Sequence, residues 1–326
     1  MHSNSSSTTA AARSIDASAV KKKSGYLYRL KKDLVRNKLI YLILLPVVAY
    51  YVIFHYVPMY GAQIAFKQFS PAKGILASEW VGFIHFKQFF SSFYFWRVLK
   101  NTLLISFYEL IFGFPAPILL ALLLNEVRVR FFKRAVQTIT YIPHFISVVI
   151  VVGMTVDFFS LNGLVNQLLG MFGVEPLKFF NSSDYFRFLF VGSGIWQGVG
   201  WGSIIYLAAI AGIDPSLYEA ARVDGANRFK QIRHITLPGI APTIIILFIL
   251  TIGHFMSVGA EKIILLYNPA MYETADTIST FVYRKGLLES NYSFSAAVGL
   301  FNSVINFILL IITNRLSSSL TDTKLW

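Results

Sequence analysis

One carboxylate stands apart among the side chains that could do chemistry. Glu109 lies well inside an apolar run of this 326-residue chain. Carboxylates at such depth usually face a cavity or a partner rather than lipid. Glu109 is therefore a candidate for proton coupling, for pairing with another subunit or for contact with a substrate, and the sequence leaves these roles open.

Several polar or aromatic side chains in other apolar runs are candidates for lining a substrate path. Gln197 and Trp201 are four positions apart, which places them on one face of a helix. Ligand sites combine apolar and aromatic surfaces with a few hydrogen-bonding groups, a mixture that would also suit a sugar. His254, Asn302 and Asn306 are similar candidates in two further runs. For all five, the alternative is a contact or hydrogen bond between packed helices.

The motifs of common enzymes are absent from the sequence. There is no G-x-x-x-x-G-K-[ST] phosphate loop, no H-E-x-x-H and no G-x-S-x-G. The absence of cysteine excludes disulfides, thiolate metal sites and a cysteine nucleophile. We therefore expect no catalytic residue, no metal site and no cofactor bound by this chain, so any ATP that drives it must bind another polypeptide.

A polar, basic stretch, Glu219–Pro238, separates two long apolar runs. Helix formers lead up to Gly225, which is free to adopt the left-handed conformation that ends a helix. Helical residues resume after the Asp224-Gly225 turn, and Pro238 is expected to end this second helix. The second helix carries an apolar stripe: Phe229, Ile232 and Ile235.

The same stretch resembles the EAA loop of permease subunits in binding-protein-dependent ABC importers. The family pattern is E-A-A-x3-G-x9-I-x-L-P, and every fixed position matches: Glu219, Ala220, Ala221, Gly225, Ile235, Leu237 and Pro238. The resemblance implies a coupling helix that docks into a groove on a separate ATPase subunit. The small side chains of Ala220 and Ala221 would allow close approach, and Glu219 would pair with an arginine of the ATPase.

Shorter motifs resemble a branch of that family that imports oligosaccharides and polysaccharides and includes permeases of alginate importers. Among them are Pro58–Gly61, Trp80–Phe83, Tyr141–Ser147 and the final Leu325-Trp326, and the similarity covers about Leu39–Trp326. It implies a second permease, identical or different, two ATPase subunits that bind ATP and Mg, and an extracytoplasmic solute-binding protein. Closure of the ATPases would then switch the path from inward-facing to outward-facing.

Composition is typical of a polytopic membrane protein. Hydrophobic residues make up 55% of the chain and charged residues 14%, with a mean hydropathy of +0.59. Soluble domains carry about 25% charged residues. Six apolar runs approach the roughly 20 residues that cross a bilayer. We expect the spans near Leu39–Val57, Asn101–Leu124, Thr138–Phe158, Phe188–Gly212, Pro242–Ala260 and Ser293–Thr313.

The distribution of Lys and Arg predicts the orientation. With the N-terminus inside, the inner segments hold 19 of the 29 basic residues and the outer loops hold 10. Basic residues favour the cytoplasmic side. We therefore expect both termini and the coupling loop in the cytoplasm of a cell-membrane protein. The net charge of +13 then serves topology and membrane lipid, and nucleic acid is not an expected partner.

Four parts are expected along the chain. Residues 1–24 are a disordered cytoplasmic tail, and residues 25–98 hold a basic interfacial helix or simple anchor, the first span and an aromatic outer loop. Residues 99–315 form the core permease domain, and residues 316–326 a cytoplasmic tail. In the fourth span, Gly194, Gly198 and Gly202 make a small-residue face, which predicts helix packing that either slides during transport or is static.

These observations favour an all-α membrane protein with six transmembrane helices and a cytoplasmic coupling helix, of the type I ABC importer kind. A proton-coupled secondary transporter that uses Glu109 is one alternative, although such carriers usually show paired repeats, and none is evident. A membrane enzyme is the other, and the missing catalytic motifs count against it.

Overall fold

The computed structural model describes residues 33–321, so the expected N-terminal tail, most of the interfacial helix and the last five residues lie outside it. The chain divides into two compact units, residues 1–60 and 61–326. The boundaries expected at residues 98 and 315 remain predictions. Both positions fall within continuous helices, α6 (Phe95–Tyr108) and α18 (Tyr292–Thr321).

The described part of the first unit is helical. It consists of α2 (Lys38–Tyr51), a π-helical turn η1 (Val52–Tyr56) and α3 (Val57–Met59). None of these elements buries a residue, although their side chains are mostly apolar. A helix that is apolar all round suits lipid contact rather than water.

The second unit opens with a small folded segment. It contains η2 (Tyr60–Phe66), β1 (Lys67–Gln68), α4 (Gly74–Ala77), β2 (Glu79–Trp80) and α5 (Ile84–Phe90). The two strands pair antiparallel, with Lys67 opposite Trp80. The Phe66 ring stacks on the Trp80 ring at a centroid distance of 5.7 Å, so part of the aromatic loop expected from the sequence packs on itself.

Helices make up the remainder of the second unit. After α6 come η3 (Glu109–Gly113), α7 (Pro115–Glu126), α8 (Arg130–Tyr141), η4 (Ile142–Phe145), α9 (Val148–Phe158), α10 (Leu164–Met171), η5 (Ser183–Tyr185) and α11 (Phe186–Ala211). Then follow α12 (Pro215–Val223), α13 (Arg228–Gln231), η6 (Ile232–Thr236), α14 (Leu237–Gly253), α15 (Ala260–Leu266), η7 (Pro269–Met271), α16 (Tyr272–Ala275), α17 (Ile278–Tyr283), η8 (Arg284–Leu288) and α18.

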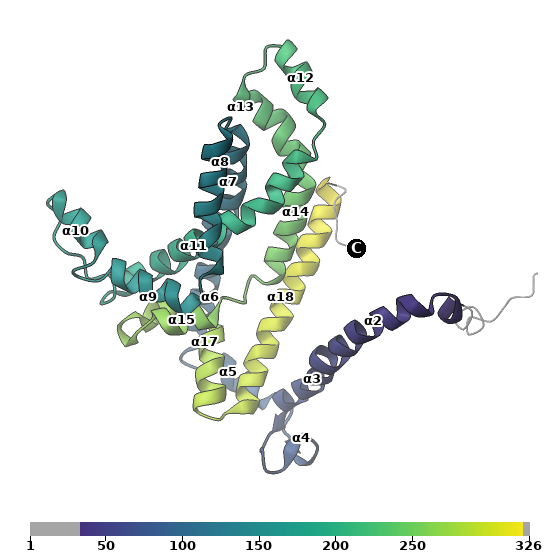
Figure 1. Ribbon diagram of the computed structural model, residues 1–326. Helices are drawn as coiled ribbons and strands as arrows, with labels where there is room; N and C mark the ends of the chain where they lie inside the picture. The colour runs from purple at the N-terminus through teal and green to yellow at the C-terminus, as the bar shows by residue number, and fades with distance from the viewer. Residues whose placement is uncertain (1–32, 322–326) are drawn as a thin grey trace, which may run out of the picture. The chain divides into compact units, whose positions relative to one another are not determined.

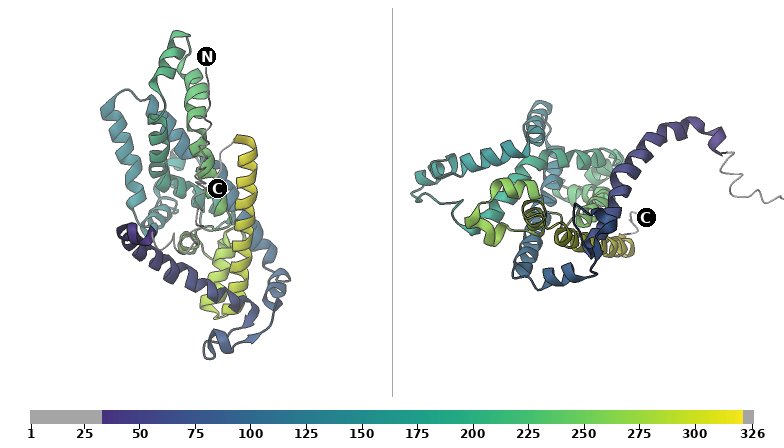
Figure 2. Two further views of the ribbon diagram at one scale, coloured as in Figure 1. Left: turned by 90° about the vertical axis from the view of Figure 1, so that its right-hand side faces the viewer. Right: turned by 90° about the horizontal axis from the view of Figure 1, so that it is seen from below.

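The arrangement of these helices is centred on α11. It packs against α7, α8 and α14, and α14 in turn packs along α18. Figure 1 shows α12 and α13 at one end of this unit and α17 at the opposite end, and both views in Figure 2 show α14 beside α18. The coupling loop expected from the sequence therefore lies far from the α15–α17 segment.

Five helices of the described residues are long and apolar enough to cross a membrane, or six if a bent pair is one span. The five are Lys38–Phe66, Phe95–Glu126, Ser183–Ala211, Arg228–Gly253 and Tyr292–Ser319. The all-helical membrane fold expected from the sequence is confirmed. The third expected span is broken, because Arg130–Phe145 and Val148–Phe158 meet at 107°. Ile146 is extended after the turn that contains Pro143, and the Ser147 side chain caps the new helix.

Three prolines of the long helices each follow a wide turn. These pairs are η1 with Pro58, η3 with Pro115 and η6 with Pro238. In each pair the residue after the turn donates its N–H to the carbonyl five residues earlier. In a regular α-helix, the proline ring would collide with the carbonyl four residues earlier. A single π-helical turn changes that spacing, so the helix continues through the proline.

The expectation that Pro238 ends a helix is therefore wrong. Residues Arg228–Gly253 form one continuous helix, in which Pro238 occupies the first turn of α14. The π-helical turn η6 also shifts the phase of the expected apolar stripe. Phe229 is 70% exposed, whereas Ile232 and Ile235 are half-buried.

Candidate functional site

The loop between α11 and α14 begins with a capped helix. The Asp214 side chain accepts a hydrogen bond from the Ser216 backbone N–H at 2.9 Å, which caps the N-terminus of α12. Hydrogen bonds from Ser216 hold the pKa of the Asp214 carboxyl below its usual value. Pro215 occupies the first turn, where its missing N–H costs nothing. The sequence thus starts α12 directly after α11.

A left-handed glycine makes the turn between α12 and α13. Gly225 has a φ of +75°, as the Asp-Gly sequence predicts. The Ala226 N–H donates to the Ala221 carbonyl at 2.8 Å, which closes the end of α12. The Asn227 side chain then accepts from the Lys230 N–H at 2.9 Å and caps α13. Each half of the loop is therefore a capped helix with a fixed turn between them.

Two contacts join this loop to the rest of the second unit. The Arg228 guanidinium donates to the Glu126 carboxylate at the end of α7 at 2.8 Å. The Tyr218 hydroxyl and the Thr236 hydroxyl are 3.0 Å apart, which links α12 to η6. Local sequence patterns could not predict these contacts, because they join residues 18 and 102 positions apart.

The free side of the loop combines polar, small and apolar side chains. Glu219, Ala220 and Asp224 are exposed, and Ala221 is half-buried. Beside them Leu217 is 52% exposed and Val223 is 88% exposed. Of the remaining pattern residues, Ile235 and Leu237 are half-buried and Pro238 is exposed.

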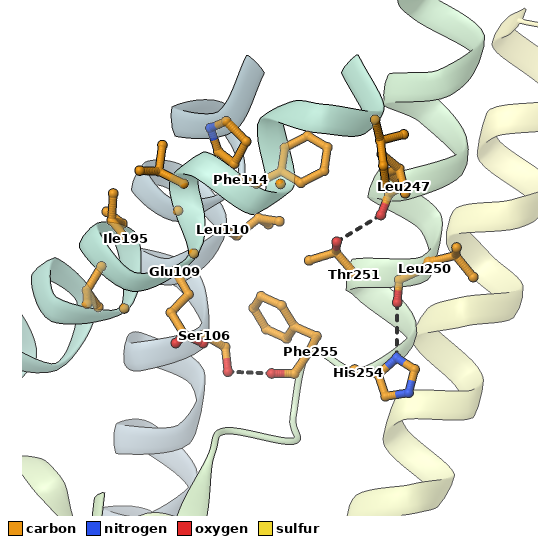
Figure 3. Close-up of a pocket in the computed structure, with 18 of the residues that line it drawn as sticks. Ser106, Glu109, Leu110, Phe114, Ile195, Leu247, Leu250, Thr251, His254 and Phe255 are labelled. Atoms are coloured by element: carbon orange, nitrogen blue, oxygen red, sulfur yellow. Dashed lines mark hydrogen bonds between the residues drawn. The ribbon is translucent and has the colours of Figure 1, made fainter. Parts of the chain in front are cut away.

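A central cavity of about 670 Å³ lies between α6–η3, α11 and α14 (Figure 3). Its polar lining includes Ser106, Glu109, Thr251 and His254. His254 Nδ1 lies 3.2 Å from the Leu250 carbonyl, so one ring nitrogen is engaged by its own helix. The cavity thus brings together two of the predicted path residues, Glu109 and His254.

Glu109 has an electrostatic partner at this cavity. The carboxylate interacts with the ammonium of Lys262 on α15. The Lys262 ammonium donates to the Phe190 carbonyl at 2.7 Å and lies over the Phe190 ring. Lys262, which no local pattern in the sequence singles out, therefore lies close enough for its charge to interact with that of Glu109.

The small-residue face of α11 lines the central cavity, since Gly194, Gly198 and Gly202 all contribute to its wall. The tightest helix approach occurs at a different glycine. A Cβ at Gly200 would overlap the carbonyl of Thr140 on α8, whereas a Cβ at Gly198 would meet nothing within 4 Å. Gly200 is therefore the position at which α11 and α8 require a glycine.

The other predicted path residues lie outside the central cavity. Gln197 donates to the Ile146 carbonyl at 3.0 Å, and the Trp201 ring stacks on His144 at a centroid distance of 4.5 Å. Asn306 accepts from the Met256 N–H at 2.8 Å and donates to the Ser257 hydroxyl at 3.0 Å. These contacts fit the second role expected for these residues, in which they join packed helices rather than line a substrate path. The buried Oδ1 of Asn302 has no hydrogen-bond partner among the described residues.

A buried carboxylate orders the α15–α17 end of the unit. Asp276 is fully buried and accepts from Arg97 at 3.3 Å and Arg284 at 2.8 Å. Its other oxygen accepts from the Thr280 hydroxyl at 2.9 Å. Opposite charges and hydrogen bonds of this kind are what make a buried carboxylate tolerable. Among residues 33–321, no group of three or more His, Asp or Glu could hold a metal ion.

Comparison with known proteins gives consistent matches. Residues 113–322 match the family described as "Binding-protein-dependent transport system inner membrane component". Protein LplB of Bacillus subtilis (strain 168) is 46% identical over 89% of this chain and 92% of its own length. The polygalacturonan/rhamnogalacturonan transport system permease protein YteP of the same organism is 44% identical over 97% and 98%.

Solved structures agree with these matches. One chain in the crystal structure of a bacterial ABC transporter involved in the import of the acidic polysaccharide alginate is 48% identical. It superposes with a TM-score of 0.83 over 90% of this chain and 99% of that chain. A chain of the bacterial alginate ABC transporter in complex with an alginate pentasaccharide-bound periplasmic protein is 47% identical, with a TM-score of 0.84 over 91% and 100%.

Proposed function

This chain belongs to the binding-protein-dependent transport system inner membrane components, the permease subunits of ABC importers, and we propose that it forms half of a translocation path for an oligosaccharide or polysaccharide. A second permease would form the other half. Two ATPase subunits would bind ATP and Mg, and an extracytoplasmic binding protein would deliver the sugar. Both termini and the α12 loop would face the cytoplasm.

The structure of the α12–α13 loop is the main support for a role in coupling the ATPase to the membrane helices. Its two capped helices expose apolar side chains at one end of the second unit, and Glu219, Ala220 and Ala221 lie on α12. A partner ATPase that moved α12 would move the membrane helices with it, because Arg228 is tied to α7 and α13 is continuous with α14. Movement at the loop would thus reach helices that wall the central cavity.

The central cavity and the relatives together support the sugar class. Hydroxyl, imidazole and carboxylate groups share the cavity wall with aromatic and aliphatic side chains. This mixture suits a sugar, whose hydroxyl groups need hydrogen bonds while its ring faces need apolar contact. Relatives that are 44% and 48% identical over nine-tenths of the chain serve polygalacturonan/rhamnogalacturonan and alginate transport.

Family membership sets aside the proton-coupled carrier and the membrane enzyme that the sequence left open. In the structure, Glu109 interacts electrostatically with Lys262 on α15, although the two form no ion pair within 4 Å. We therefore assign Glu109 to the cavity wall as a positioning group for Lys262 and for sugar hydroxyls.

Uptake by the reconstituted complex tests this proposal. We expect uptake of sugar delivered by the binding protein to require ATP on the side of the ATPases and to persist when the proton gradient is collapsed. The Glu109→Gln variant keeps the side-chain shape and removes the charge. Uptake by this variant should still require ATP and should not depend on the proton gradient. Uptake driven by the proton gradient without ATPase subunits would contradict the proposal. So would a gradient-driven uptake that disappears in the Glu109→Gln variant.

A further inference from the structure

A second cavity, of about 500 Å³, adjoins the central one and has a different character. Its wall includes Tyr108, Phe112, Asp184 and Arg187. We call it the aromatic cavity. Val191 and Ile195 also line the central cavity, so the two spaces share a wall of α11. With the cytoplasmic α12 loop at the other end of α11, the aromatic cavity lies toward the extracytoplasmic side.

The aromatic cavity holds an arginine whose charge is not matched by a carboxylate. Within the described part of the chain, the one side-chain hydrogen bond of Arg187 is to a neutral group, the Asn101 amide oxygen at 3.0 Å. Its Nε is buried and has no partner. Among residues 33–321, Arg187 forms no ion pair. A half-buried guanidinium without an ion pair therefore has the capacity to bind an anion through its terminal N–H groups.

The surrounding network fixes Arg187 in place and keeps its charge available. Asn101 is buried and donates its amide N–H groups to the carbonyls of Glu273 at 2.8 Å and Asp276 at 3.1 Å. These bonds orient its oxygen toward Arg187. The carboxylate of Asp276 is already occupied by Arg97 and Arg284. Asp276 is thus already paired, and Asp184, which shares the cavity wall, forms no ion pair with Arg187.

The remaining lining has the components of a sugar site. The rings of Tyr108 and Phe112 lie nearly parallel, with 23° between their planes, and present an aromatic surface. Asp184 accepts a hydrogen bond from the Ser182 hydroxyl at 3.1 Å through one oxygen, and its other oxygen can accept a sugar hydroxyl. The aromatic rings and the Asp184 oxygen suit the ring face and hydroxyl groups of a sugar, and the unpaired arginine favours a sugar that carries its own carboxylate.

We propose that the aromatic cavity binds one uronate residue of the incoming oligosaccharide, with its carboxylate on Arg187 and its ring on Tyr108 and Phe112. This inference rests on the proposed sugar-import function. It adds the substrate class, an acidic sugar, and names Arg187 as the residue that binds the sugar carboxylate. A neutral sugar of the same size would leave the guanidinium desolvated and unmatched, which is the physical basis of the selection.

A cysteine reporter can detect occupancy directly, because the chain has no native cysteine. Gly192 lines the aromatic cavity and has open space for a Cβ, so Gly192→Cys reports on it. The matched reporter, Gly170→Cys, also has open space but lies on α10 outside the cavity. Labelling by a thiol reagent would be read on this chain after the subunits of the assembled transporter are separated.

The probes are oligogalacturonate and its methyl ester, which differ only in the charge of the carboxyl groups. We expect oligogalacturonate to slow labelling of Gly192→Cys but not of Gly170→Cys, and the ester to protect neither. Adding Arg187→Gln should raise the protecting concentration about tenfold or more, as expected for loss of a charged hydrogen bond. Arg187→Lys should restore part of the protection. Lys178→Gln, which removes an exposed charge, should leave it unchanged.

Three results would overturn the proposal: equal protection by acid and ester, protection that survives Arg187→Gln, or no protection by millimolar oligogalacturonate. Stimulation of ATP hydrolysis by the loaded binding protein is a separate readout of the importer itself. A transporter that responds to loaded binding protein but shows no charge-selective protection refutes the uronate site alone. One that responds to no carbohydrate refutes the proposed function.

Discussion

The backbone of Gly225 determines how the chain turns between α12 and α13. Its positive φ could be predicted, because an Asp-Gly pair after a run of helix formers is a local signal. Its surroundings could not be predicted. A Cβ there meets nothing within 4 Å, so the requirement for glycine is one of backbone conformation rather than of space.

Gly225→Val should therefore impair coupling, since a β-branched residue in the left-handed region costs about 1–3 kcal/mol. We expect weaker assembly with the ATPase and reduced sugar-stimulated ATP hydrolysis. Gly225→Asn is the matched control, because asparagine tolerates positive φ. It should retain most of the activity. If the valine variant behaves like wild type, the turn does not position the coupling surface.

Other residue roles depend on partners far away in the sequence and for this reason were beyond prediction. Asn306 was a candidate for the sugar path, yet it bonds the backbone and side chain of residues 50 and 49 positions away. Lys262 and Arg187 were counted only as basic residues of outer loops. A cavity that brings side chains of three helices together leaves no local pattern in any one of them.

At the scale of elements, the sequence predicted which segments are helices better than how they continue or bend. Pro238 was expected to end a helix because local rules treat proline as a helix breaker. The preceding π-helical turn η6 accommodates it, and the helix continues through the proline. The break between α8 and α9 is of the same kind, since an apolar run looks alike whether it is straight or bent by 107°.

The packing of α11 gives a test at this scale. Gly200→Ala should push α8 and α11 apart, because its Cβ would overlap the Thr140 carbonyl, and backbone cannot move as easily as a side chain. We expect a cost of about 1–3 kcal/mol, typical of overpacking, and a clear fall in the thermal stability of the purified complex. Gly198→Ala, two positions away, meets nothing within 4 Å and should not lower the stability. Equal stability of both variants would show that the helices approach elsewhere.

At the scale of the whole molecule, hydropathy and the spacing of the EAA pattern were sufficient to predict the family and the general fold. Both signals are carried by residues close together in the chain. Long apolar runs must be helical in a bilayer, because every backbone polar group needs an internal partner there. The orientation depends on the 19 inner and 10 outer basic residues, a statistical bias that no contact within the chain expresses.

Cysteine labelling in intact cells tests the orientation, and the native chain contributes no background. Asn181 and Ser216 are both exposed, and they flank the 29-residue helix Ser183–Ala211. If that helix crosses the membrane, the two positions lie on opposite sides. We expect an impermeant thiol reagent to label Asn181→Cys and to spare Ser216→Cys until the cells are permeabilised. The reverse pattern would invert the orientation and place the α12 loop on the side of the binding protein. Labelling of both positions in intact cells would mean that this helix does not span the membrane.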